Sequence, residues 1–79
     1  RSALRRDHRR ILPLISVAAL PGRARRRDWA AWEVSFSRAE AALENNRCRG
    51  RDLRTMLRTA AEITWASGSK SRAKRVDGL

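Results

Sequence analysis

The scarcity of large apolar side chains limits what this chain can fold into. Of its 79 residues 33 are apolar, but 13 of these are Ala and one is Cys, which leaves 19 side chains large enough to fill a core. Ordering a residue costs roughly 1.5 kcal/mol of entropy, whereas buried apolar surface contributes about 25 cal/mol per Å². In a single small domain with so few large apolar side chains, the free energy gained by apolar burial at best equals the entropic cost of ordering the chain. We therefore expect a partner surface to complete the fold.

The composition also excludes several kinds of protein. The longest apolar run, residues 11–20, contains Pro13 and is half as long as the roughly 20 residues that a membrane-spanning helix needs. We expect no transmembrane segment. Cys48 and His8 each stand alone, which excludes a disulfide framework and disfavours a metal site. The sequence lacks a glycine-rich phosphate loop and a Ser-His-Asp set, so we expect no enzyme activity, no cofactor and no small-molecule substrate.

The net charge of +11 is unevenly distributed and divides the chain into three segments. Residues 1–27 carry nine Arg and one Asp, and we interpret them as a basic, partly helical N-terminal arm. Residues 28–67 have no net charge and are predicted to form the folded body, an α-hairpin. Residues 68–79 carry a charge of +3 in a stretch with Gly and Ser, which predicts a basic, flexible tail. Such a neutral centre with basic flanks is typical of proteins whose arms lie along a polyanion.

Apolar periodicity predicts two helices in the body. Between residues 28 and 46 apolar side chains recur in steps of three and four, at Trp29, Trp32, Phe36, Ala39 and Leu43. Asp28 is placed to cap this helix. A second helix is predicted over residues 52–66, with Asp52 as its cap and Gly68 just past its end. The short link predicts that the two helices are antiparallel neighbours.

The N-terminal arm has a helical stripe that proline interrupts. We predict a helix over residues 2–11, a kink at Pro13, and a shorter helix to Ala19 or Leu20 that Pro21 and Gly22 end. A strand over residues 14–20 is the alternative. The predicted fold is thus all-α, with an antiparallel helical hairpin preceded by a kinked basic helix and followed by a basic extended tail.

The basic residues are the candidate binding residues. Seventeen of the nineteen are Arg, whose guanidinium group bridges phosphate oxygens or stacks on bases; a biased nucleotide composition would also favour Arg over Lys. The alternative interpretation of each cluster is a solvated run of charge. The residues predicted to contact RNA are Arg5, Arg6, Arg9, Arg10, Arg23, Arg25, Arg26, Arg27, Arg47, Arg49, Arg51, Lys70, Arg72, Lys74 and Arg75.

Two further sets of side chains have competing interpretations. The three tryptophans, Trp29, Trp32 and Trp65, would stack on bases in a single-strand binding protein, but their positions on apolar helix faces favour packing in a core or protein interface. The acidic residues at positions 33, 40 and 44 are predicted to lie on an exposed flank, where Arg38 and Arg47 can pair with them.

Part of the chain resembles the bacterial-type large-subunit ribosomal protein family numbered twenty. In that family a basic-acidic-aromatic step leads into an Ala-rich helix, a short polar loop and a second helix. Residues 26–29 match the step, and the two helices are matched by Ala39, Ala41, Ala42, Glu44 and Asn45 and by Leu53, Met56, Leu57, Arg58 and Ala60. The chain departs from the family after Trp32, where the core motif is replaced, and in a longer loop. The resemblance implies an all-α body packed on ribosomal RNA.

These observations lead to a functional hypothesis with two alternatives. We expect a non-catalytic protein that binds structured RNA, namely rRNA, beside neighbouring proteins of a large assembly such as a ribosome. A structural accessory subunit of an organellar membrane complex and a DNA-binding helix-turn-helix regulator are the alternatives. The sequence does not begin with Met, which suits a processed organellar protein or an incomplete chain. We expect a mitochondrial location, with the cytoplasm as the alternative.

Overall fold

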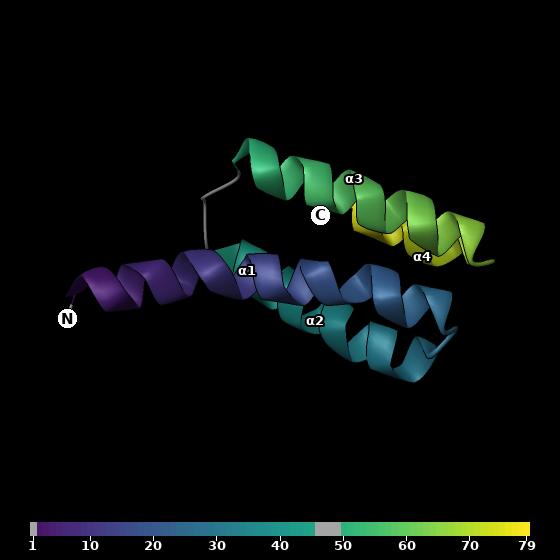
Figure 1. Cartoon of the computed structure of the whole chain (residues 1–79), viewed down its shortest axis with the longest axis horizontal. Helices are drawn as coiled ribbons and strands as arrows, with labels where there is room; N and C mark the ends of the chain where they lie inside the picture. The colour runs from purple at the N-terminus through teal and green to yellow at the C-terminus, as the bar shows by residue number, and fades with distance from the viewer. Residues whose placement is uncertain (1, 46–49) are drawn as a thin grey trace.

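The computed structural model describes the backbone of residues 2–45 and 50–79 and the side chains of residues 14–44 and 50–79. It confirms the all-α prediction with helices α1 (Ser2–Arg25), α2 (Trp29–Asn45), α3 (Arg51–Ala66) and α4 (Lys70–Asp77). The helices form two antiparallel pairs, α1 with α2 and α3 with α4, and α1 also packs against α3. The predicted hairpin of residues 28–67 is therefore wrong, because α2 and α3 each pair with the helix on their other side in the chain. Both pairs reverse direction at the same end of the molecule, on the right in Figure 1. None of the described helices is both long and apolar enough to cross a bilayer.

One hydrophobic core joins all four helices. The apolar stripe predicted for α2 is buried, with Trp29 half-buried at its start. The core also takes side chains from α1 and α4, which lie outside the predicted hairpin of residues 28–67. Its buried members are Val17, Leu20, Ala24, Trp32, Phe36, Ala39, Leu43, Leu53, Ala60, Ala61 and Val76. The interior therefore depends on segments that the charge distribution had assigned to an arm and a tail.

Helix α1 is continuous, so the predicted division into two helices at Pro13, the end at Pro21 and the alternative strand are all wrong. It runs from Ser2 to Arg25 through Pro13, Pro21 and Gly22. Each proline removes one backbone donor from the helix. Val17, Leu20 and Ala24, spaced by three and four residues, are nevertheless fully buried. Their burial against the neighbouring helices outweighs the local cost of proline, because most helical stability comes from packing.

The two reversals have the same backbone geometry. After α1, the amide of Arg27 donates to the carbonyl of Ala24 and that of Asp28 to Arg23; after α3, Gly68 and Ser69 donate in the same way. This is the Schellman pattern, in which one residue adopts a left-handed conformation. Gly68 has φ +109°, but Arg27 has φ 55°, a conformation that costs a non-glycine residue about 1 kcal/mol.

Arg27 connects the two reversals to each other. Its Nε donates a hydrogen bond of 3.2 Å to the carbonyl oxygen of Ser67 in the turn between α3 and α4. The left-handed residue therefore ties the α1–α2 pair to the α3–α4 pair at the end where both chains reverse.

The helix caps match the predictions only in part. Asp28 caps α2 as predicted, because its Oδ1 accepts a hydrogen bond of 3.2 Å from the amide of Ala31. Gly68 follows the end of α3, also as predicted. Asp52 does not cap α3: that helix begins at Arg51, its N-cap is Gly50, and Asp52 lies in the first turn, where a negative charge still favours the helix dipole.

The predicted extended tail is instead a helix. Ser69 caps α4 by accepting a hydrogen bond from the amide of Arg72, and the helix runs to Asp77. Ala73 and Val76 are buried. The eight residues of α4 have a high share of charge, and these two small apolar side chains with spacing i, i+3 give the helix its buried face.

Candidate nucleic-acid interface

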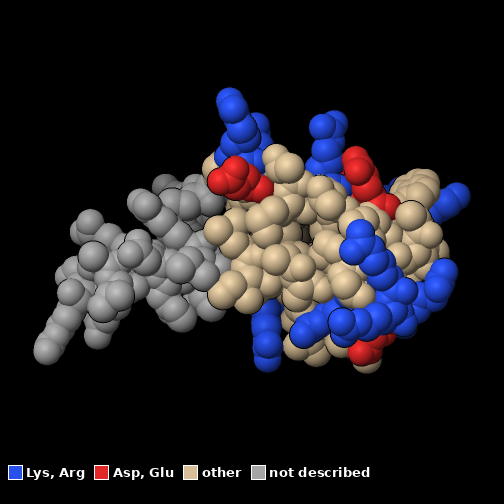
Figure 2. Space-filling model, viewed as in Figure 1, with Lys and Arg blue, Asp and Glu red and all other residues tan. Residues whose placement is uncertain are grey.

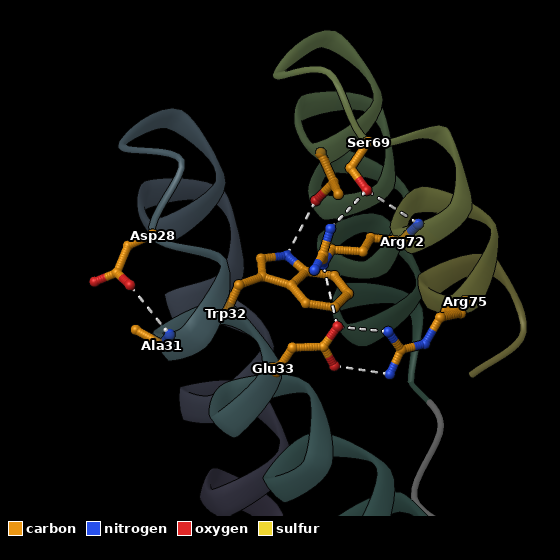
Figure 3. Close-up of polar contacts among 8 residues, drawn as sticks. Asp28, Ala31, Trp32, Glu33, Ser69, Arg72 and Arg75 are labelled. Carbon is orange, nitrogen blue, oxygen red and sulfur yellow. Dashed lines mark hydrogen bonds and ion pairs between the residues drawn. The ribbon is translucent and has the colours of Figure 1, made fainter.

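Two arginines of α4 hold that helix against α2, over an aromatic row formed by Trp29, Trp32 and Phe36. Arg75 makes a two-pronged ion pair with Glu33, with N–O distances of 2.6 and 2.9 Å, and Arg72 Nε donates to the same carboxylate at 3.1 Å. Figure 3 shows the carboxylate between the two guanidinium groups. The predicted partners of the acidic flank were Arg38 and Arg47; the observed partners of Glu33 come from the segment that we had interpreted as a tail.

The same guanidinium groups lie over aromatic rings. Arg72 is 4.8 Å from the ring centroid of Trp29, and Arg75 is 4.5 Å from that of Phe36. Trp32 lies between these rings, stacked on Phe36 at 5.2 Å. Such cation–π contacts add to the ion pairs. Arg72 and Arg75, both predicted to contact RNA, thus make internal contacts that position α4.

The Glu33 cluster shifts two ionisation equilibria. Hydrogen bonds from Arg75, together with the positive charges of Arg75 and Arg72, hold the pKa of Glu33 below its usual value, although partial burial opposes the shift. The hydrogen bond to Glu33 correspondingly raises the pKa of Arg75. Because the folded state holds the carboxylate ionised, it is stabilised relative to the unfolded chain above the usual carboxyl pKa.

This linkage predicts a loss of stability in acid. Since the pKa of Glu33 is lowered on folding, its contribution is complete above the unfolded pKa and is lost as pH falls through the folded value, below about pH 4. We expect Glu33→Gln to cost about 1 kcal/mol at neutral pH and to flatten the pH dependence in that range. Thermal unfolding followed by circular dichroism would measure both effects. Glu44→Gln, at an exposed site on α2, is the control; identical pH profiles for wild type and Glu33→Gln would contradict the prediction.

The arginine cluster at residues 23–27 is divided by the structure. Arg23 is half-buried and donates to the carbonyl oxygen of Ala31 at 3.0 Å and to the hydroxyl of Ser35. Arg25, Arg26 and Arg27 are exposed. Figure 2 shows Lys and Arg gathered over this end of the molecule. Arg23 and Arg25 lie in the last turn of α1, where positive charge stabilises the helix dipole.

A second basic surface runs along α3 and was largely missed at the sequence level. Arg51, Arg54 and Arg58 are exposed, and Arg54 and Arg58 border a hollow of about 270 Å³ with Thr55 and Thr59. Figure 2 shows basic side chains projecting along the upper edge of the molecule, where α3 lies in Figure 1. We name these three arginines the α3 row. Only Arg51 had been predicted to bind RNA, although spacing by three and four residues places all three on one helix face.

The remaining predicted binding residues fall into two groups. Lys70 and Lys74 are exposed on α4, and Nζ of Lys70 lies 5.2 Å from the ring centroid of Trp65. Arg47 and Arg49 lie outside the described residues, as does Cys48. Arg5, Arg6, Arg9 and Arg10 belong to the α1 backbone, but their side chains are not among those described, nor is that of His8.

The ion pairs and ligand clusters in the described part of the chain are few. Among residues 14–44 and 50–79, every ion pair involves Glu33. Within those residues no carboxylate therefore pairs with the α3 row or with Arg25, Arg26 and Arg38. The same residues contain no group of three or more His, Cys, Asp or Glu side chains that could hold a metal. Comparison with protein-family models, curated proteins and solved structures finds no match to this chain.

Proposed function

We propose that this chain is a non-catalytic protein that binds structured RNA as part of a ribonucleoprotein, with rRNA as its target. The observation that carries the proposal is the α3 row, in which three exposed guanidinium groups share a helix face without a carboxylate partner among the described residues. Like charges three and four residues apart destabilise a helix. Phosphate groups would relieve that repulsion, and Arg binds phosphate with two parallel hydrogen bonds.

The exposed arginines at the α1–α2 reversal support the same proposal. Arg25 and Arg26 are without ion-pair partners among the described residues, and Arg27 is fixed in place by its hydrogen bond to Ser67. An arginine held by the backbone loses less side-chain entropy when it meets a phosphate than a free one does. The net charge of +11 would speed the encounter with any polyanion.

A titration over a range of KCl concentrations tests the proposal. Binding of a labelled RNA hairpin would be measured by fluorescence anisotropy. If about eight phosphates are neutralised, the slope of log K against log [KCl] should be about −6 to −7. The double variant Arg54→Gln, Arg58→Gln should weaken binding and reduce that slope by about two.

The matched control is Arg38→Glu. It changes the net charge by the same amount as the double variant but lies on α2, outside the proposed interface. We expect it to leave the slope nearly unchanged. An interaction that is insensitive to salt, or an equal loss in both variants, would contradict the assignment of the α3 row. Equally tight binding to anionic vesicles would favour the membrane-complex alternative.

A further inference from the structure

A groove between α3 and α4 combines an aromatic ring with side chains of both charge signs. It has a volume of about 370 Å³ and is lined by Arg58, Ala61, Glu62, Trp65, Ala73 and Asp77. The two alanines are buried, and their small side chains leave the space open between the helices. Glu62 and Asp77 bring carboxylates from both helices, and Arg58 brings a guanidinium group that also borders the neighbouring hollow on α3. The groove is therefore continuous with the α3 row.

Trp65 differs from the other aromatic residues of the chain. Trp32 is fully buried, whereas Trp65 is 48% exposed. Lys70 lies over its ring at 5.2 Å, so a positive charge stands beside the exposed aromatic surface. The sequence predicted that all three tryptophans pack in a core or a protein interface. The structure leaves Trp65 outside the core, with its ring at the edge of the groove.

We propose that this groove holds one unpaired nucleobase of the bound RNA and prefers guanine, an inference that rests on the proposed function. Trp65 would stack on the base, as aromatic side chains do in proteins that bind single strands. Arg58 and Lys70 would face the adjoining phosphates. A cationic occupant is disfavoured because these two basic side chains already balance the two acidic ones.

The carboxylates account for the preference among bases. Ionised Glu62 and Asp77 accept hydrogen bonds and donate none. Guanine presents two adjacent donors, N1–H and N2–H, on its Watson–Crick edge, which match the two oxygens of one carboxylate. Adenine and cytosine each present an amino group beside an acceptor nitrogen, and uracil presents one N–H between two carbonyl groups. A carboxylate therefore repels part of each of these edges and pairs fully only with guanine.

The test uses one labelled hairpin RNA with a single unpaired loop position occupied by guanine, adenine or an abasic site. For the wild-type chain we expect guanine to bind about tenfold more tightly than the abasic RNA. Trp65→Ala should remove most of that difference, and Trp65→Phe should restore much of it. Glu62→Gln should lower the ratio of guanine to adenine affinity, whereas the change in affinity that follows from the lost negative charge should be the same for the abasic RNA. Free GMP is titrated in parallel.

The outcomes separate this inference from the proposed function. If binding depends on salt but is the same for every loop base and is unchanged by Trp65→Ala, the groove does not hold a base, and the proposed function still stands. The absence of salt-dependent RNA binding would overturn both. If free GMP binds as tightly as the guanine hairpin, the occupant of the groove is a free nucleotide and not a base of the bound RNA. Circular dichroism of each variant shows whether it remains folded. Because Glu62 is exposed, Glu62→Gln still tests the preference for guanine if Trp65→Ala unfolds the chain.

Discussion

Replacing Trp32 with alanine should unfold most of the molecules at room temperature. Trp32 is fully buried, stacks on Phe36 at 5.2 Å and meets Trp29 edge-on at 6.4 Å. Its Nε1 donates a hydrogen bond of 3.3 Å to the hydroxyl of Thr64, which is itself fully buried. The substitution removes the largest core side chain and leaves Thr64 without this donor, at a cost of about 3–5 kcal/mol. A small domain has little more stability than that to lose.

The measurement is the helical circular dichroism signal at 25 °C and its thermal transition. Trp65→Ala is the matched control, because the same substitution at a side chain that is 48% exposed should cost far less. A Trp32→Ala chain that melts as cooperatively as Trp65→Ala, at a similar temperature, would show that the aromatic row does not support the core. The pair also separates the tryptophan that stabilises the fold from the one assigned to the groove.

The central helices could be predicted because their signals are local. The steps of three and four from Trp29 to Leu43 give α2 directly, and Asp28 and Gly68 mark helix ends through backbone chemistry that the residue types reveal. The continuity of α1 could not be predicted in this way. Pro13 and Pro21 each weaken a helix locally, and the burial that outweighs them depends on helices that follow later in the chain.

The packing of α4 against α2 could not be predicted from the sequence for a similar reason. Arg72 and Arg75 look like residues of a solvated basic tail until Glu33, 39 and 42 positions earlier, is placed against them. Charge counted along the sequence treats every arginine as equivalent. The structure separates those that pair with Glu33 from those that have no carboxylate partner among the described residues. Arg72 and Arg75 therefore leave the set of candidate RNA contacts, and the exposed Arg54 and Arg58 of the α3 row, which had not been predicted to bind RNA, join it.

Replacing Val76 with aspartate should detach α4. Val76 is fully buried in the core shared by all four helices, and it is one of two buried residues on this short helix. The substitution removes apolar contacts and places a carboxylate in an apolar site, which together should cost about 3 kcal/mol or more. An isolated helix of eight residues is not stable in water, so α4 should lose its helical structure once it no longer packs.

Val34→Asp is the matched control, since Val34 is 49% exposed on α2 and the same chemical change there should cost little. Amide hydrogen exchange would locate the effect: in Val76→Asp, protection should fall first across residues 70–79, and the Glu33 ion pairs should be lost with it. The freed Arg72 and Arg75 would then add two cationic side chains to those available to RNA. A weaker fold with a steeper salt dependence of RNA binding is thus the expected combined result, whereas unchanged protection in α4 would show that the helix does not depend on Val76.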